Sequence, residues 1–108
     1  MNLIVNVNGP KPSMKAIWND TVVAESEDTI IVDGYHYFPL ESLRREFFVP
    51  SATTTLCAWK GEASYYSLQV KGKTNPDAAW YYERPLPAAA RIKGRVRSWS
   101  GVKVEGKR

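Results

Sequence analysis

The first residues that could carry out chemistry lie between Thr53 and Leu68, where Cys57 precedes a Lys-Gly pair by three residues. Cys57 is the only cysteine of the 108-residue chain, and the ammonium group of Lys60 could lower the pKa of its thiol. A nucleophilic cysteine also needs a general base, and this stretch contains no histidine. We therefore interpret Cys57 as a small, buried apolar residue. An enzyme that uses Cys57 or Lys60 is kept as an alternative.

Lys60 could also form a binding site together with aromatic residues. Period-two alternation puts Trp80 and Tyr82 on one face with the small Ala78, which leaves space beside two large rings. A lysine held among rings can bind a carboxylate or phosphate while the rings stack on a planar or apolar part of the ligand. The simpler alternative is a solvated lysine above core aromatic residues. We predict a non-catalytic domain that binds a small molecule, with an anion favoured by Lys60. The candidate ligand-binding residues are Trp59, Lys60, Tyr65, Trp80 and Tyr82.

A second cationic feature lies near the end of the chain. Residues 83–108 hold eight Lys or Arg residues and two acidic residues, although the net charge of the whole chain is only +4. Arg91, Lys93, Arg95 and Arg97 alternate with other residues, so a strand would place four cations on one face over ~20 Å. This stripe suggests a polyanion or protein interaction module as a second alternative, with nucleic acid as one candidate partner. The simpler interpretation is a solvated face that prevents pairing at a sheet edge.

Several classes of site lack the residues they require. One cysteine and one histidine, His36, cannot form an internal disulfide or a zinc site built from Cys and His. We find no Asp-x-Asp pair, Walker or dinucleotide glycine motif, or Gly-x-Ser-x-Gly elbow. We therefore predict no metal and no cofactor. Residues 1–13 lack a basic region and a long apolar run, so we expect no membrane segment and a cytoplasmic location.

The elements that must position these residues are mostly strands. Apolar residues alternate with polar ones in short segments, and Gly, Pro or Asn residues separate the segments. Asn19-Asp20 and Asp33-Gly34 are typical of tight turns. The predicted strands are Lys15–Trp18, Thr21–Ala24, Thr29–Val32, Thr53–Cys57, Ala63–Val70, Ala78–Tyr82, Arg91–Ser98 and Val102–Glu105.

One segment has helical spacing instead. In the stretch PLESLRREFF, Pro39 suits a first helical turn, and Leu40, Leu43 and Phe47 recur at helical intervals before Pro50. A chain of 108 residues has room for a single domain. The sequence therefore predicts one mainly all-β domain with one short helix.

An ordered set of short motifs resembles the bacterial domain-of-unknown-function family 427 over residues 14–105. The motifs are Tyr37-Phe38-Pro39, Pro50-Ser51, T-x-C-x-x-KG-x-A-x-Y from Thr55 to Tyr65, AW-x-Y from Ala79 to Tyr82, and I-x-G from Ile92 to Gly94. The resemblance implies coiled antiparallel sheets in a tent-like arrangement, related to B-type methionine sulfoxide reductases without their zinc cysteines. It also implies a β-rich domain over residues 14–108, with residues 1–13 as an N-terminal extension or an extra strand.

The chain departs from this family pattern at two places that affect function. Where relatives often have histidine before the cysteine and proline after it, this chain has Leu56 and Ala58. Where relatives usually have aromatic and small apolar residues, it has Arg95, Arg97 and Ser98. The family is sometimes labelled as nucleotidyltransferases, but that reaction needs metal-binding carboxylates and a phosphate cradle. The sequence has neither an Asp-x-Asp pair nor a Walker or dinucleotide glycine motif, so it gives that label no support.

Overall fold

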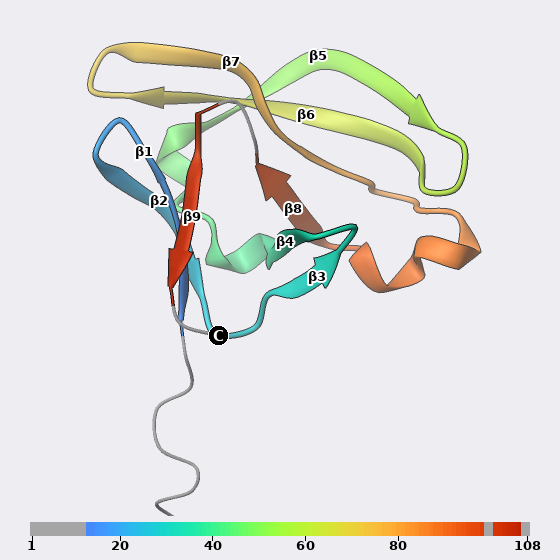
Figure 1. The fold of residues 1–108 in the computed structure, drawn as a ribbon. Helices are drawn as coiled ribbons and strands as arrows, with labels where there is room; N and C mark the ends of the chain where they lie inside the picture. The colour runs from blue at the N-terminus through green and yellow to red at the C-terminus, as the bar shows by residue number, and fades with distance from the viewer. Residues whose placement is uncertain (1–12, 99–100, 107–108) are drawn as a thin grey trace, which may run out of the picture.

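A computed structural model describes residues 13–98 and 101–106, and these residues form two antiparallel sheets (Figure 1). The strand order is β2-β1-β9 in the smaller sheet and β3-β4-β8-β7-β6-β5 in the larger one. The sheets do not close into a barrel, and the predicted mainly β fold is confirmed. The strands are β1 (Met14–Trp18), β2 (Thr21–Ser26), β3 (Ile30–Val32), β4 (Tyr35–Pro39), β5 (Phe48–Cys57), β6 (Gly61–Val70), β7 (Lys73–Tyr81), β8 (Arg95–Ser98) and β9 (Lys103–Gly106).

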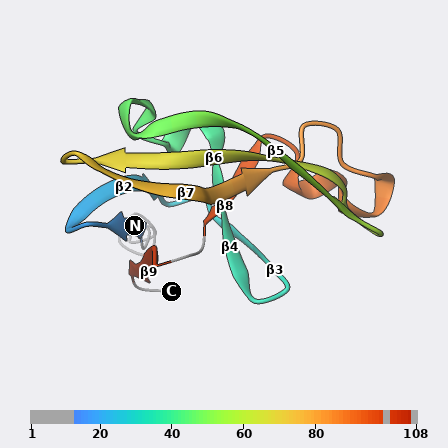
Figure 2. The same ribbon diagram turned by 90° about the horizontal axis from the view of Figure 1, so that it is seen from above.

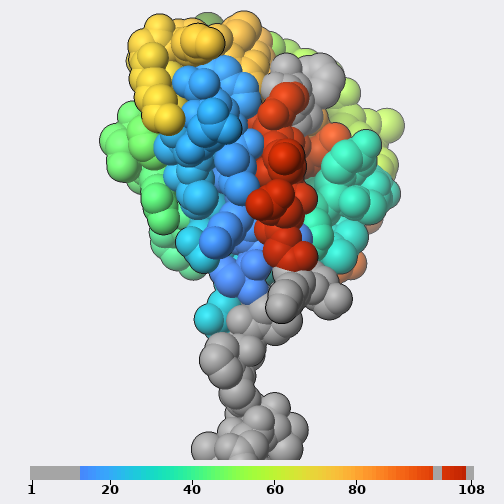
Figure 3. Space-filling view, turned by 60° about the vertical axis from the view of Figure 1, so that its left-hand side comes forward, coloured from blue at the N-terminus to red at the C-terminus, as the bar shows by residue number. Residues whose placement is uncertain are grey.

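The long strands β5, β6 and β7 lie across the top of the molecule in Figure 1, and shorter strands descend from them. The view from above separates the smaller sheet from the β3–β4 hairpin (Figure 2). In Figure 3, β9 lies beside the β1–β2 hairpin, and the β6–β7 turn covers the top of that hairpin. There the Asn19 side chain donates a hydrogen bond of 3.1 Å to the carbonyl of Val70. These arrangements give the tent-like shape.

Two-residue turns connect the β1–β2, β3–β4 and β6–β7 hairpins. Asn19 and Asp20 have φ values of 52° and 57°, and Asp33 and Gly34 have values of 54° and 84°. Positive φ at both central residues is the type I′ geometry, whose twist matches that of the flanking strands. The hairpin predicted at Asn19-Asp20 and the turn predicted at Asp33-Gly34 are therefore confirmed. Lys71-Gly72 forms a third turn of the same kind, with φ values of 53° and 78°.

The helical spacing after Pro39 produces two 3-10 turns, η1 (Leu40–Ser42) and η2 (Arg45–Phe47). Leu43 interrupts them because it is extended, with φ −76° and ψ 140°, and forms an isolated antiparallel bridge with Ala24 of β2. Leu43 is also buried in the core. Long-range pairing thus replaces the continuous helix that local spacing favoured.

The prediction of a strand over Arg91–Ser98 is wrong in its first half. Residues Pro87–Ile92 form η3, a 3-10 segment with a proline in its first turn, and β8 begins only at Arg95. Gly94, with φ 74°, separates the two elements. The alanines that follow Pro87 favour a helical turn over a strand.

The larger sheet is covered on both faces. One core cluster includes Phe38, Leu68 and Val96 and packs between the two sheets, where the predicted inner residues Tyr66, Leu68 and Val70 are buried. Tyr65 belongs to the opposite face, which is also packed. A second cluster covers that face and consists of Val32, Tyr37, Ala63, Tyr82, Ala89 and Ile92. Its last two members belong to η3, which therefore lies over the sheet.

Candidate functional site

Lys60 lies in the turn between β5 and β6, next to Gly61, whose φ of 109° is unfavourable for other residues. The carbonyl of Lys60 accepts a backbone hydrogen bond of 2.9 Å from Leu86. The chain segment before η3 is thereby fixed to this turn. Although Lys60 is in a turn, the residue is only 6% exposed, so its side chain is directed into the protein.

The ammonium group of Lys60 has a carboxylate, a hydroxyl and three rings around it. It lies 3.1 Å from the Asp33 carboxylate and donates a hydrogen bond of 3.3 Å to the Tyr37 hydroxyl. Its distances to the ring centroids of Tyr37, Trp59 and Tyr82 are 5.8, 5.1 and 6.0 Å. Ring faces at such distances attract a cation. We call this arrangement the Lys60 cage; its residues are Asp33, Tyr37, Trp59, Lys60 and Tyr82.

The cage holds Lys60 in its charged form. Burial lowers the pKa of Lys60, but the hydrogen bonds with Asp33 and Tyr37, together with the nearby tyrosines, outweigh burial and raise it. Burial also raises the pKa of Tyr82, and the charge of Lys60 partly opposes that rise. An amine with a raised pKa is a poor nucleophile near neutral pH. The electrostatics of the cage thus suit the binding of an anion better than covalent chemistry at Lys60.

Asp33 is the exposed partner of this ion pair. Its side chain is 55% exposed, whereas the Lys60 side chain is 7% exposed. Asp33 also occupies the tight β3–β4 turn, far from Lys60 in the sequence. The buried cation is therefore neutralised by a carboxylate that remains largely in contact with solvent.

The predicted binding residues divide into two neighbouring groups. Trp59 and Tyr82 lie beside Lys60 in the cage. Tyr65 and Trp80 instead face each other across β6 and β7, with ring centroids 5.5 Å apart, and both pack against the second core cluster. The Tyr65 hydroxyl shares a hydrogen bond of 3.0 Å with the Thr55 hydroxyl.

Sequence reasoning missed Asp33 and Tyr37 as members of the cage. The sequence marks Asp33 as part of a turn and Tyr37 as part of a family motif, but it does not predict strand β4. Without β4, nothing in the sequence placed a hairpin near residue 60. The available signal was that Tyr35 and Tyr37 flank His36 and would share one face of a strand.

Cys57 and His36 each contact other residues. Cys57 is partly buried and packs against the second core cluster, beside Tyr82. His36 Nδ1 shares a hydrogen bond of 2.9 Å with the Thr29 hydroxyl. Within residues 13–98 and 101–106, no group of three or more His, Cys, Asp or Glu residues is placed to hold a metal ion.

The four cations of the stripe do not share one strand face. Arg91 belongs to η3 and donates a hydrogen bond of 3.4 Å to the carbonyl of Ile31, and Lys93 follows η3. Arg95 lies in β8 and forms an ion pair of 3.2 Å with Asp28. The predicted geometry of the stripe is therefore wrong, because η3 occupies its first half. Binding of polyanions by these residues stays a prediction.

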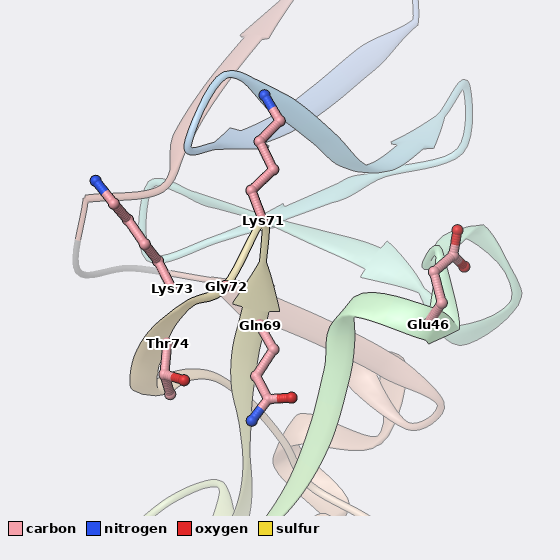
Figure 4. Close-up of a pocket in the computed structure, with 6 residues that line it drawn as sticks. All are labelled: Glu46, Gln69, Lys71, Gly72, Lys73 and Thr74. Carbon is pink, nitrogen blue, oxygen red and sulfur yellow. The ribbon is translucent and has the colours of Figure 1, made fainter.

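Two surface depressions lie away from the Lys60 cage. One, of about 390 Å³, surrounds the β6–β7 turn, and its residues are all exposed. Its side chains point in different directions, with Glu46 well apart from Lys71 and Lys73, so they do not converge on a ligand (Figure 4). The second, of about 380 Å³, is lined by Leu40, Tyr66, Tyr81, Glu83, Lys93 and Gly94.

Comparisons with known proteins address the family of the chain. A search of curated proteins found no match. Among the described residues there is no helix long and apolar enough to cross a membrane. The family described as a domain of unknown function, DUF427, matches residues 7–107, which extends beyond the motif-based resemblance at both ends. The chain therefore belongs to the DUF427 family.

Proposed function

We propose that this protein is a non-catalytic binding domain that recognises a small anion at the Lys60 cage. One observation carries the proposal: the Lys60 ammonium group is buried, whereas its counter-ion, Asp33, is mostly exposed. A purely structural pair that is buried usually has both partners desolvated and fully hydrogen-bonded. Here the buried partner is positive and the exposed partner is the one that can leave.

A ligand oxyanion can exchange with the Asp33 carboxylate at little electrostatic cost. Lys60 keeps a negative partner during the exchange, and Asp33 returns to water, where most of its surface already lies. Trp59 is 41% exposed and offers a ring face to an apolar or planar part of the same ligand. The ligand class is therefore a small carboxylate or phosphate with a planar body.

The competing interpretation is that the ion pair only ties the β3–β4 turn to the β5–β6 turn. In that case, removing either charge should change stability and leave anion binding unaffected. Under our proposal, Asp33 competes with the ligand, so removing its charge should improve binding. The two interpretations thus predict different effects of the same substitution.

The test is a thermal-shift screen of small carboxylates and phosphates, followed by calorimetric titration of each hit with variants. Asp33→Asn should tighten binding about tenfold, which corresponds to about 1.4 kcal/mol, because it removes the competing charge. The variant should still fold, since asparagine also tolerates the left-handed backbone at this position. Lys60→Met should abolish binding while the protein still folds.

Asp28→Asn is the matched control, since Asp28 is also an exposed aspartate paired with a cation. It should leave the affinity unchanged. Equal affinities of the parent protein and Asp33→Asn, or unchanged binding by a folded Lys60→Met variant, would refute the proposal.

A further inference from the structure

Arg97 in β8 lies between two aromatic rings from the neighbouring strands. Its guanidinium carbon is 3.5 Å from the ring centroid of Tyr35 in β4 and 4.4 Å from that of Trp80 in β7. The strand order β4-β8-β7 and the pairing of Trp80 with Arg97 produce this arrangement. Rings from the strands on both sides of β8 therefore lie close to the guanidinium group.

Among the described residues, Arg97 carries a positive charge without a carboxylate partner. Arg95 pairs with Asp28, Arg44 with Glu25, and Lys60 with Asp33. In the part of the chain that the structure describes, no acidic side chain lies within ion-pair distance of Arg97, and its buried Nε has no hydrogen-bond partner. A partly desolvated cation of this kind is stabilised when an anion binds to it.

We propose that Arg97 is the recognition residue of a second anion-binding site, which is separate from the Lys60 cage. Two rings lie close to its guanidinium group and Nε is buried, which leaves the edge formed by the two terminal nitrogens for a ligand. That edge matches two oxygens of a carboxylate or phosphate through parallel hydrogen bonds. Arg97 as a residue is partly exposed.

The exposed ring of Tyr35 indicates the rest of the ligand. Tyr35 is 49% exposed, and one of its faces stacks on Arg97. An aromatic ring of a ligand can stack on the other face while its acidic group reaches the guanidinium edge. The expected ligand is a small aryl carboxylate or aryl phosphate. A role limited to joining β4 and β7 by stacking would require no such ligand.

The test uses the full chain labelled with nitrogen-15 and follows the Nε–Hε resonance of Arg97 by NMR. This resonance is assigned by its loss in Arg97→Lys. Inorganic phosphate, phenyl phosphate and benzoate are titrated separately at constant ionic strength. We expect a saturable shift at Arg97 with phenyl phosphate or benzoate, at millimolar concentrations or below, and binding of phenyl phosphate at least tenfold tighter than that of inorganic phosphate. The two aryl probes distinguish a phosphate from a carboxylate source.

Variants separate this site from charge alone and from the Lys60 cage. Arg97→Lys keeps the charge but loses the planar edge, so ligand affinity, measured by calorimetry in a Lys60→Met background that lacks the cage site, should fall at least tenfold. Arg95→Lys in the same background is the matched control on the same strand and should keep its affinity. In Lys60→Met alone, the saturable shift of the Arg97 resonance should remain. The absence of a saturable shift at Arg97, undiminished binding by Arg97→Lys, or a shift with single-stranded nucleic acid but none of the small probes would overturn the proposal.

Discussion

Replacing Tyr37 with phenylalanine tests whether the hydroxyl of this residue stabilises the buried Lys60 cation. The substitution removes one oxygen atom and keeps the ring, which is completely buried. Lys60 then loses its hydrogen bond of 3.3 Å and retains Asp33 at 3.1 Å. Hydrogen bonds to charged groups contribute about 1.5–3 kcal/mol, and the remaining ion pair favours the lower part of this range. We therefore expect the free energy of unfolding to fall by about 1.5–2 kcal/mol.

The assay is urea denaturation followed by circular dichroism, with the slope of the transition checked for constancy. Tyr35→Phe is the matched control, because Tyr35 lies two residues away in β4, is 49% exposed and keeps its stack on Arg97 without the hydroxyl. It should change stability by no more than about 0.5 kcal/mol. A loss for Tyr37→Phe that is equally small would refute the reasoning.

A double-mutant cycle identifies the partner of this hydroxyl. In a Lys60→Met background the Tyr37 hydroxyl has lost its donor, so Tyr37→Phe should cost little or even stabilise the protein. The coupling free energy between the two residues should be about 1–2 kcal/mol. Equal losses in both backgrounds would show that the hydroxyl acts through another group.

Three further predictions concern pH, the thiol and a glycine. Burial lowers the pKa of Lys60, but its hydrogen bonds raise it above 10.5, so the stability that the charged amine contributes is present below pH 10.5 and is lost as pH rises through the folded-state pKa. In urea denaturation, Lys60→Met should therefore lose less stability than the parent protein over this alkaline range. Equal losses in the two proteins would contradict this. Cys57→Ser should bind anions normally in calorimetry, and Cys57 should label slowly with a thiol reagent; rapid labelling well below pH ~8.5 would revive the enzyme alternative. Gly106→Ala should lower the free energy of unfolding by about 1–2 kcal/mol, because its Cβ would collide with the Ser13 carbonyl where β9 meets β1; unchanged stability would contradict this.

The sequence predicted the parts of the fold that depend on local conformation. Asn19-Asp20 and Asp33-Gly34 adopt positive φ because their own side chains, or the lack of one, permit it. The region after Pro39 could not be predicted in this way. There Leu43 pairs with Ala24, and a contact between segments distant in sequence decides against a continuous helix.

The difference between local patterns and long-range contacts also explains which members of the candidate site the sequence could predict. Trp59 is the sequence neighbour of Lys60, and alternation correctly grouped Tyr82 with Trp80. Alternation wrongly placed Ala78 with them, since Ala78 belongs to the first core cluster. Asp33 and Tyr37 reach Lys60 only because the β3–β4 hairpin packs against the β5–β6 turn, and local patterns do not carry that information. The stripe was mispredicted for a related reason, since regular alternation of cations cannot reveal that the first of them belong to η3.

The two anion sites that we propose share strand β4. Tyr35 and Tyr37 alternate in β4, so successive side chains on one face of this strand serve Arg97 and Lys60 respectively. Of these two cations, Lys60 alone has a carboxylate partner among the described residues. Under our proposals an anion would therefore replace Asp33 at Lys60, whereas it would add directly to Arg97. Neutralising Asp33 should consequently tighten binding at Lys60 and leave binding at Arg97 unchanged. Asp33→Asn by itself thus distinguishes exchange of anions at Lys60 from simple addition of an anion at Arg97.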